Sequence, residues 1–260
     1  MSAKNLVLAL GVGFFLNSFS AFAFPAPGNY DSYVLAISYQ NDFCVAKPEK
    51  PECRAGGGHF GMALHGLWPN QVNDFDHGYQ YCSLVDADQV GSDWCAAALD
   101  ISGAMGAAVR DQLARVMPGT RSCLYNHEWY AHGTCAGGSV ATYFSQASTL
   151  AARFIALPNF KALISNAAGK AVTRELLMST LAQDLGPGSV NAAVFLCRKD
   201  TRSRRAFFAE VDLTLDRGRV MQFPEPGSLG RSSPVQGANG KPKPDMGTCP
   251  ANGIIITPPR

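Results

Sequence analysis

Three histidines and one glutamate stand in two short segments whose residue types suit acid–base chemistry. Residues 65–70 read His-Gly-Leu-Trp-Pro-Asn, and residues 127–135 read His-Glu-Trp-Tyr-Ala-His-Gly-Thr-Cys. An imidazole titrates close to neutral pH, so a pair of histidines can remove one proton and donate another within one reaction. The chain has five histidines. The remaining two, His59 and His77, have no such setting.

The spacing within the second segment predicts which side chains share a helix face. Glu128 and His132 are four residues apart, so we expect the carboxylate to hold this imidazole in one tautomer and to raise its pKa. His127 and His132 are five apart, roughly 140° around a helix. The zinc protease signature instead places its two histidines four apart. We therefore expect no metal and no other cofactor at this site.

Such a histidine pair suits cleavage of RNA by its own 2′-hydroxyl group. One imidazole would remove the 2′ proton and the other would protonate the departing 5′ oxygen, and no metal is needed because the nucleophile is already in the substrate. Two alternatives stay open from the residues alone. A lone histidine is often a hydrogen-bonded structural residue, and a zinc hydrolase would use the same residue types.

Both segments closely resemble the two active-site signatures of the ribonuclease T2 family, His-Gly-Leu-Trp-Pro and His-Glu-Trp-x-Lys-His-Gly-Thr-Cys. The first signature matches fully, and the second matches everywhere except at Ala131. The resemblance implies an endoribonuclease that forms 2′,3′-cyclic phosphates and hydrolyses them more slowly. It casts His65 and His132 as the acid–base pair, with His132 as the base. Glu128 would stabilise the transition state through the phosphate or the imidazolium.

The same resemblance implies three substrate contacts. His127 would contact the phosphate, Trp68 would stack against a base, and Asn70 would make a polar base contact. Stacking on an aromatic ring tolerates any base, so we expect little base specificity. The alternative for Trp68 is packing in the core, which is also the interpretation favoured for Trp129.

Ala131 is the departure from the family pattern, which usually has a lysine there to offset negative charge in the transition state. A cation 4 Å from such a charge contributes up to about 4 kcal/mol at an effective dielectric of 20. Arg54 and Arg121 are candidate substitutes by sequence proximity. We expect activity to survive, either at a reduced rate or with a substitute cation. The alternative function is a catalytically weak relative that binds RNA or a protein partner after export.

The N-terminus and the cysteines predict export. Lys4, the apolar run from 6 to 16 and Ala21-Phe22-Ala23 form a signal peptide pattern. We expect cleavage after Ala23, which divides the chain into a leader, 1–23, and one catalytic domain, 24–260. No later run is long enough to span a membrane, so the mature protein should be a periplasmic or secreted monomer with RNA as its partner.

Eight cysteines predict four disulfides in an exported chain, without fixing their pairing. The family resemblance implies three pairs, and the fourth follows by exclusion. The expected pairs are Cys44–Cys53, Cys82–Cys135, Cys197–Cys249 and Cys95–Cys123.

The charge balance excludes RNA binding by bulk charge. The net charge is +2, and loss of the leader would reduce it by one, so RNA must bind weakly or in a local groove. One basic cluster lies in a predicted hairpin turn and is interpreted as a solvated turn or as a phosphate-binding rim. It contains Arg198, Lys199, Arg202, Arg204 and Arg205.

The elements that must position these residues follow from periodicity and from turn residues. Alternation predicts strands over 32–39 and 59–65 and a hairpin of 193–198 with 207–215. Pro69 must end the second strand or lie at a sheet edge, which would place His65 where a strand meets a loop. Helices are expected over 102–117, 125–132, 139–156, from Pro158, and over 173–185. The fold class is α+β, with a mostly antiparallel sheet, several packed helices and a single disulfide-stapled domain.

Overall fold

The computed structural model describes residues 26–54, 61–71, 79–83, 93–232, 235–236, 242–243 and 247–259. The expected signal peptide lies outside the described residues. His59 and His77 lie outside them as well.

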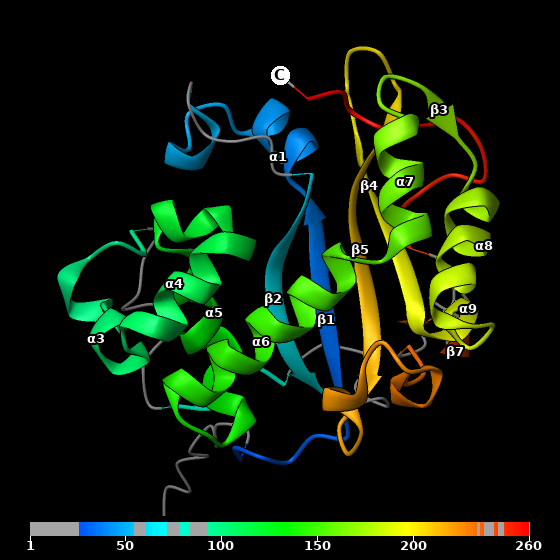
Figure 1. Ribbon diagram of the computed structural model, residues 1–260. Coiled ribbons are helices and arrows are strands. Elements are labelled where there is room, and N and C mark those ends of the chain that lie inside the picture. Colours follow the sequence, from blue (N-terminus) through cyan, green and yellow to red (C-terminus); the bar gives the residue numbers. More distant parts are fainter. Residues whose placement is uncertain are drawn as a thin grey trace, which may run out of the picture.

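A six-stranded sheet forms the centre of the molecule (Figure 1). Its first strand pairs antiparallel with β2 on one side and with β5 on the other, and β4 pairs antiparallel with the far edge of β5. A short β8 runs parallel to the start of β5 and antiparallel to β3. The mostly antiparallel sheet is therefore confirmed. The strands are β1 (Ser32–Tyr39), β2 (Met62–Asn70), β3 (Ala171–Val172), β4 (Ala193–Lys199), β5 (Ala206–Asp216) and β8 (Ile254–Ile255), and a separate pair contains β6 (Val235–Gln236) and β7 (Pro242–Lys243).

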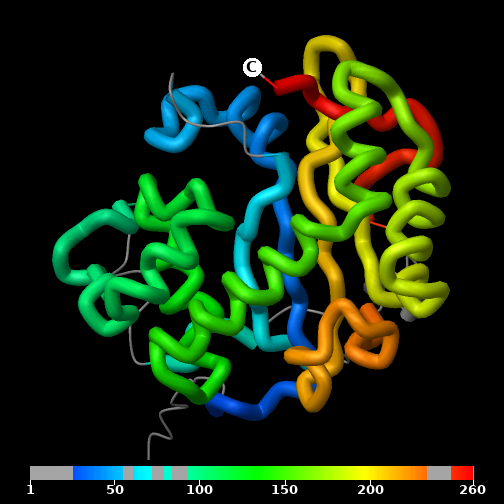
Figure 2. The backbone as a smooth tube through the Cα atoms, viewed as in Figure 1, coloured from blue at the N-terminus to red at the C-terminus, as the bar shows by residue number. Residues whose placement is uncertain are grey.

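Helices gather on one face of this sheet and to both sides of it, which confirms the α+β class (Figure 1). The tube view shows α6 crossing in front of the first two strands, with the shorter helices α3 to α5 to one side (Figure 2). The α-helices are α1 (Gln40–Ala46), α3 (Ser102–Met105), α4 (Ala107–Val116), α5 (Leu124–Ala131), α6 (Val140–Ile155), α7 (Pro158–Asn166), α8 (Arg174–Leu185) and α9 (Ser189–Ala192). Short 3-10 turns cover 51–53, 97–99, 118–122, 133–136, 220–222 and 226–228.

Helix ends follow the capping residues in the sequence. The Ser139 hydroxyl accepts a hydrogen bond from the Thr142 amide, and the Thr173 hydroxyl accepts one from the Leu176 amide. These contacts satisfy backbone donors that the first helical turn leaves free. One expectation is wrong, because residues 102–117 form two helices. Gly106 separates them with a φ of 78°, a conformation that suits glycine.

The two faces of the sheet have different compositions. Leu35, Ile37 and Leu213 are fully buried, as are the α6 side chains Phe144 and Phe154 in the same hydrophobic core. The opposite face carries the alternate residues of each strand, including the aromatic and acidic side chains described below. One face therefore provides the core, while the other face is available for chemistry.

β2 continues past the point expected from the sequence. It runs through Pro69 to Asn70 and pairs with β1 alone, so the missing N–H of the proline lies at a sheet edge. His65 therefore lies within the strand and not at its end, which corrects the sequence-based expectation. The register shifts there, because Ala36 pairs with Gly66 while the next residue of β1 pairs with residue 64. This leaves His65 as the extra residue of a β-bulge, a feature that reorients side chains.

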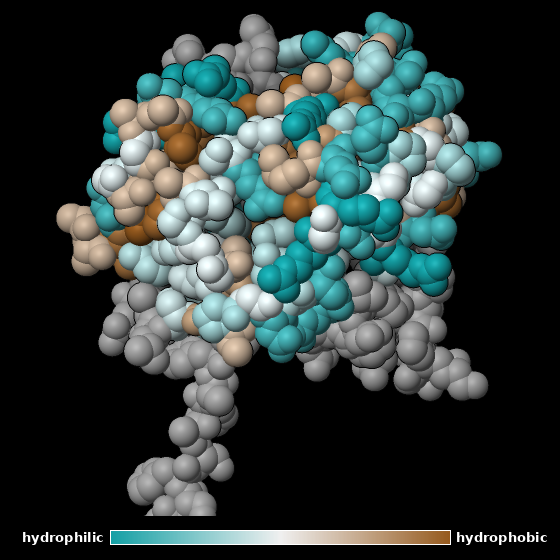
Figure 3. Space-filling view, turned by 60° about the horizontal axis from the view of Figure 1, so that its bottom comes forward, coloured by the Kyte–Doolittle hydropathy of each residue, from teal (hydrophilic) through white to brown (hydrophobic). Residues whose placement is uncertain are grey.

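All four expected disulfides are present: Cys44–Cys53, Cys82–Cys135, Cys95–Cys123 and Cys197–Cys249. Four disulfides are consistent with an exported protein. Over the part of the chain that the structure describes, no helix combines the length and apolar character needed to cross a bilayer. The face in Figure 3 is mostly hydrophilic, and its hydrophobic residues form small separate groups.

Candidate active site

His65 contacts carboxylates on both sides of its ring. Its Nδ1 lies 2.8 Å from Glu210 Oε2 on β5, and its Nε2 lies 3.8 Å from Glu128 Oε1 on α5. The Ser38 hydroxyl donates a second hydrogen bond to the Glu210 carboxylate. Burial disfavours the imidazolium, but the charge and hydrogen bond of Glu210, helped by Glu128 and Asp212, raise the pKa of His65 to about 10. His65 is therefore a cation at neutral pH.

Glu128 is the buried carboxylate of the site, and it is fully inaccessible to solvent. The indole N–H of Trp68 donates to its Oε2 over 2.8 Å. Burial raises the pKa of Glu128 to about 7, against the opposing effects of His65 and Trp68. The carboxylate lies so close to β2 that a Cβ on Gly66 would be 2.0 Å from Oε2. The glycine of the first segment therefore makes room for the glutamate of the second.

His132 follows α5 as its C-cap, with φ −125° and ψ −46°. Its ring lies 5.1 Å from the Trp68 ring, and Trp68 lies 5.3 Å from His65 on its other side. Burial lowers the pKa of His132 to about 3, reinforced by the charges of His127 and His65. The expectation that Glu128 raises this pKa is wrong. Because His132 leaves the helical conformation, the Glu128 carboxylate reaches Trp68 and His65, while His132 bonds to Glu128 through its backbone N–H and the Glu128 carbonyl oxygen.

His127 occupies the last position of the cluster. Its Nδ1 is buried without a hydrogen-bond partner within the described ranges, and its ring meets Trp94 edge-on at 4.5 Å. Burial and the His65 charge lower its pKa. Ligand atoms of His127, Glu128 and His132 lie within 4.8 Å of one another. The five-residue spacing of the two histidines therefore does not by itself exclude a metal. However, two ligand atoms on one zinc ion must approach each other to about 3.3 Å.

Two pockets open beside this cluster. The Trp68 pocket, of 380 Å³, is lined by Trp68, Asn70 and His132, so both residues expected to contact a base lie beside the expected catalytic base. The Trp94 pocket, of 240 Å³, is lined by His65, His127 and Trp94. The cluster of His65, Glu128 and His132 therefore lies beside two cavities.

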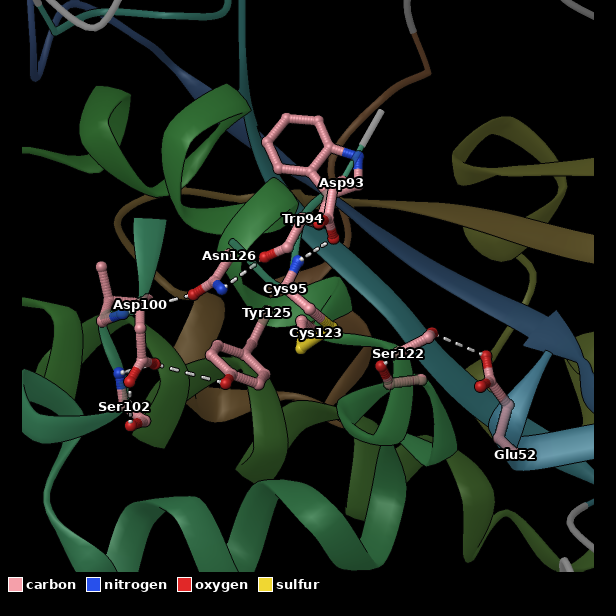
Figure 4. Close-up of a disulfide and its surroundings, with 12 residues drawn as sticks. Glu52, Asp93, Trp94, Cys95, Asp100, Ser102, Ser122, Cys123, Tyr125 and Asn126 are labelled. Atoms are coloured by element: carbon pink, nitrogen blue, oxygen red, sulfur yellow. Dashed lines mark hydrogen bonds between the residues drawn. A yellow bond between two sulfur atoms is a disulfide. The ribbon is translucent and has the colours of Figure 1, made fainter. Parts of the chain in front are cut away.

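Trp94 is held in place by its neighbours in the chain and by α5. Asn126 donates to the Trp94 carbonyl oxygen over 2.7 Å, and the Cys95–Cys123 disulfide ties the adjacent residue to the start of the helix (Figure 4). Lys50 and Glu52 also line this pocket.

The ribonuclease T2 family model matches residues 30–223. The chain belongs to the ribonuclease T2 family. It is 24% identical over 251 residues to ribonuclease I of Escherichia coli, covering 88% of this chain and 87% of that protein. A ribonuclease of Aeromonas hydrophila is 31% identical over 125 residues, covering 47% and 46% of the two chains. The protein is thus an endoribonuclease, and metal independence is consistent with its family.

Solved structures agree on the fold. Ribonuclease MC1 from bitter gourd seeds superposes with a TM-score of 0.58 at 18% identity, covering 86% of this chain and 100% of that one. The SF11-RNase of Nicotiana alata gives a TM-score of 0.58 at 15% identity, covering 88% and 100%.

This ribonuclease T2 family member places a neutral residue where the family has its lysine. Ala131 is 1% exposed, and its carbonyl oxygen accepts a hydrogen bond from the Tyr81 amide. Neither expected substitute lines the two pockets: Arg121 is exposed, and exposed Arg54 donates to the Glu49 carbonyl. Among the described residues lining these pockets, Lys50 is the single lysine or arginine.

Sequence reasoning missed Glu210, and it missed Lys50 and Glu52, which line the Trp94 pocket. A signal for Glu210 existed, because Glu210, Asp212 and Thr214 form a polar stripe opposite the apolar residues of the same strand. The short loop around Lys50 and Glu52 offers no periodicity, so its approach to the site could not be predicted. In the basic cluster, Arg198 pairs with Asp42 at 2.6 Å. The other members are exposed, Lys199 at the end of β4 and the three arginines in the connection to β5.

Proposed function

We propose that this endoribonuclease cleaves single-stranded RNA by transesterification to 2′,3′-cyclic phosphates, followed by slower hydrolysis to 3′-phosphates. One observation carries the proposal: the two histidines have opposite pKa shifts, to about 10 for His65 and to about 3 for His132. At neutral pH His65 therefore holds a proton while His132 lacks one. This is the state in which an acid and a base can act together.

In the first step, a neutral ring nitrogen of His132 takes the proton of the 2′-hydroxyl. The 2′ oxygen then forms a bond to phosphorus as the bond from phosphorus to the 5′ oxygen breaks. His65 donates its proton to that leaving oxygen. In the second step the roles reverse: His65 activates water, and His132 returns its proton to the 2′ oxygen, which restores both residues.

The lining of the two pockets supports one side for each nucleoside. His132 lines the Trp68 pocket, so this pocket would hold the nucleoside that supplies the 2′-hydroxyl. His65 lines the Trp94 pocket, which would hold the departing nucleoside. Stacking on Trp68 tolerates any base, which supports little base specificity on the first side, where Asn70 would make a polar base contact. Ribonuclease NT, a structural relative with a TM-score of 0.54, has been solved with 5′-AMP, in line with a nucleotide site in this fold.

His127 would contact the phosphate, since its partner-free Nδ1 lies beside the pair. Glu128 would sustain the charge of His65 at 3.8 Å. Four disulfides favour an oxidising compartment. We place the mature domain, residues 24–260, in the periplasm or outside the cell as a monomer.

The decisive experiment is cleavage of a single-stranded RNA by the purified, oxidised protein in excess chelator, beside His65→Ala and His132→Ala. Fragments ending in 2′,3′-cyclic phosphate, lost in both variants, are the expected result. Loss of activity on chelation would point instead to a metal held by His127, Glu128 and His132. Binding of RNA without cleavage would favour a catalytically weak relative, with Ala131 as the cause.

A further inference from the structure

We propose that Glu52 makes this enzyme prefer guanosine on the departing side of the scissile phosphate, so that it cleaves before guanine. The inference rests on the proposed function, because the side of cleavage follows from the roles of His65 and His132. The low base specificity expected from the sequence would then apply only to the nucleoside that supplies the 2′-hydroxyl.

Glu52 lines the Trp94 pocket and carries a buried acceptor without a partner among the described residues. The residue is 3% exposed and lines this pocket together with His65 and Trp94. Its Oε1 accepts a hydrogen bond from the Ser122 hydroxyl over 2.9 Å (Figure 4). Its Oε2 is buried with no hydrogen-bond partner among the described residues. A buried carboxylate oxygen without a partner is costly, which points to a ligand that supplies the missing donor.

The chemistry of a carboxylate selects among the four bases. An ionised carboxylate only accepts hydrogen bonds. Guanine alone offers two adjacent donors, N1–H and the 2-amino group, on its Watson–Crick edge. Adenine and cytosine pair one amino donor with an adjacent ring acceptor, and uracil flanks its N–H with two carbonyl oxygens. Those acceptors would face the carboxylate and repel it, so guanine fits Glu52 best.

The rest of the pocket suits a base beside the reacting phosphate. Trp94 and Phe43 provide aromatic surface for stacking. Lys50 provides a positive charge for the phosphate chain. His65, the proposed acid, lines the same pocket. A base in this pocket therefore belongs to the nucleoside whose 5′ oxygen is protonated.

Glu52 also links two loops, since Ser122 lies in a different 3-10 turn. The test must therefore separate base selection from stability. Glu52→Gln keeps the size of the side chain and an acceptor for Ser122, but replaces one oxygen with an N–H donor. Glu49→Gln is the matched control, because Glu49 lies in the same loop and is exposed.

The measurement is kcat/KM for CpG, CpA, CpC, CpU and CpI. CpI carries inosine, which keeps N1–H and lacks the 2-amino group. We expect the protein to favour CpG about ten- to a hundredfold over CpA, CpC and CpU, the discrimination of one bidentate base contact. CpI should fall between. Glu52→Gln should bring the CpG to CpA ratio close to one at an unchanged melting temperature, and Glu49→Gln should keep the ratio of the unmodified protein.

Several outcomes would overturn the assignment. Equal kcat/KM for CpG and CpA in the unmodified protein removes it while leaving the ribonuclease mechanism intact. A uniform loss on all substrates in Glu52→Gln, with a lower melting temperature, makes Glu52 a structural link. If no dinucleotide is cleaved, the mechanism fails. Calorimetric binding of 5′-GMP against 5′-AMP by His132→Ala then still tests the pocket, and equal affinities would refute the guanine preference.

Discussion

The Nδ1 atom of His65 lies 2.8 Å from Glu210 Oε2, although the two residues are 145 positions apart in the chain. The contact joins the edge strand β2 to β5 across β1, and Ser38 on β1 donates to the same carboxylate. His65 is expected to act on the phosphate directly, whereas Glu210 acts through His65. Glu210 is a positioning residue that fixes the orientation and the protonation state of the proposed acid.

Glu210→Gln should move the alkaline limb of the pH–rate profile. In the unmodified protein His65 has a pKa near 10, so kcat/KM should fall only as the pH rises through that value. Without the Glu210 carboxylate, the largest stabilisation of the imidazolium is lost while burial still opposes it, so the limb should move to lower pH. Exposed Glu225→Gln is the control. An alkaline limb that stays near pH 10 in Glu210→Gln would show that another group keeps His65 protonated.

The same pair predicts how stability depends on pH. The folded-state pKa of His65, about 10, exceeds its unfolded value near 6.5. Its contribution to stability is therefore complete below about pH 6.5 and disappears as the pH rises through about 10. Urea unfolding between pH 6 and 10 should show a loss of stability that Glu210→Gln largely lacks. Parallel pH dependences in the two proteins would contradict the assignment.

Gly66→Ala should abolish activity out of proportion to its effect on stability. The new methyl group would lie 2.0 Å from Glu128 Oε2 and 2.3 Å from Trp68 Nε1, so the buried hydrogen bond between them must break or shift. Overpacking of this kind costs about 1–3 kcal/mol, and we expect kcat to fall at least about a hundredfold. Gly103→Ala is the matched control, because no atom lies within 4 Å of its added Cβ. Full activity in Gly66→Ala would show that the Trp68–Glu128 contact is dispensable.

Lys50→Met should lower kcat/KM by about ten- to a hundredfold, because it removes the one lysine or arginine among the described residues that line the two pockets. Lys50 is half-buried in the pocket that His65 lines. Adding Ala131→Lys to this variant should restore part of the loss, because it returns the family lysine. Exposed Lys47→Met, in the same loop, should have little effect. If Ala131→Lys leaves the rate of both backgrounds unchanged, a missing positive charge does not limit this enzyme.

Removal of single disulfides should destabilise the fold according to loop length. The Cys82–Cys135 bridge spans 53 residues and Cys44–Cys53 spans 9, so the alanine pairs should lose about 4 and about 3 kcal/mol. The first loss should also reduce activity, because Cys135 lies three residues after His132 and is fully buried. Denaturant titrations of the two double variants, with RNA cleavage at a temperature where both stay folded, provide the comparison. Equal activities would show that this bridge serves stability alone.

The sequence by itself determined the family and the fold class, and it pointed to the two segments that meet at the candidate site. The two segments around His65 and His132 are long and specific, and local rules placed Ser139, Thr173 and Pro158 at the helix starts. Even the cysteine pairing followed from the resemblance. These features depend on neighbours in the chain or on spacings that a family preserves.

Tertiary structure alone decided the electrostatics of the site. Helical spacing assigned Glu128 to His132, but His132 lies outside the helical conformation, and the carboxylate contacts His65 and Trp68 instead. Glu210, Lys50 and Glu52 come from distant segments; the polar stripe of β5 marks Glu210 as unusual, but no local pattern gives its distance from His65. A pKa depends on burial and on charges within a few ångströms. Such distances are set by strand register and loop packing, which no spacing along the chain contains.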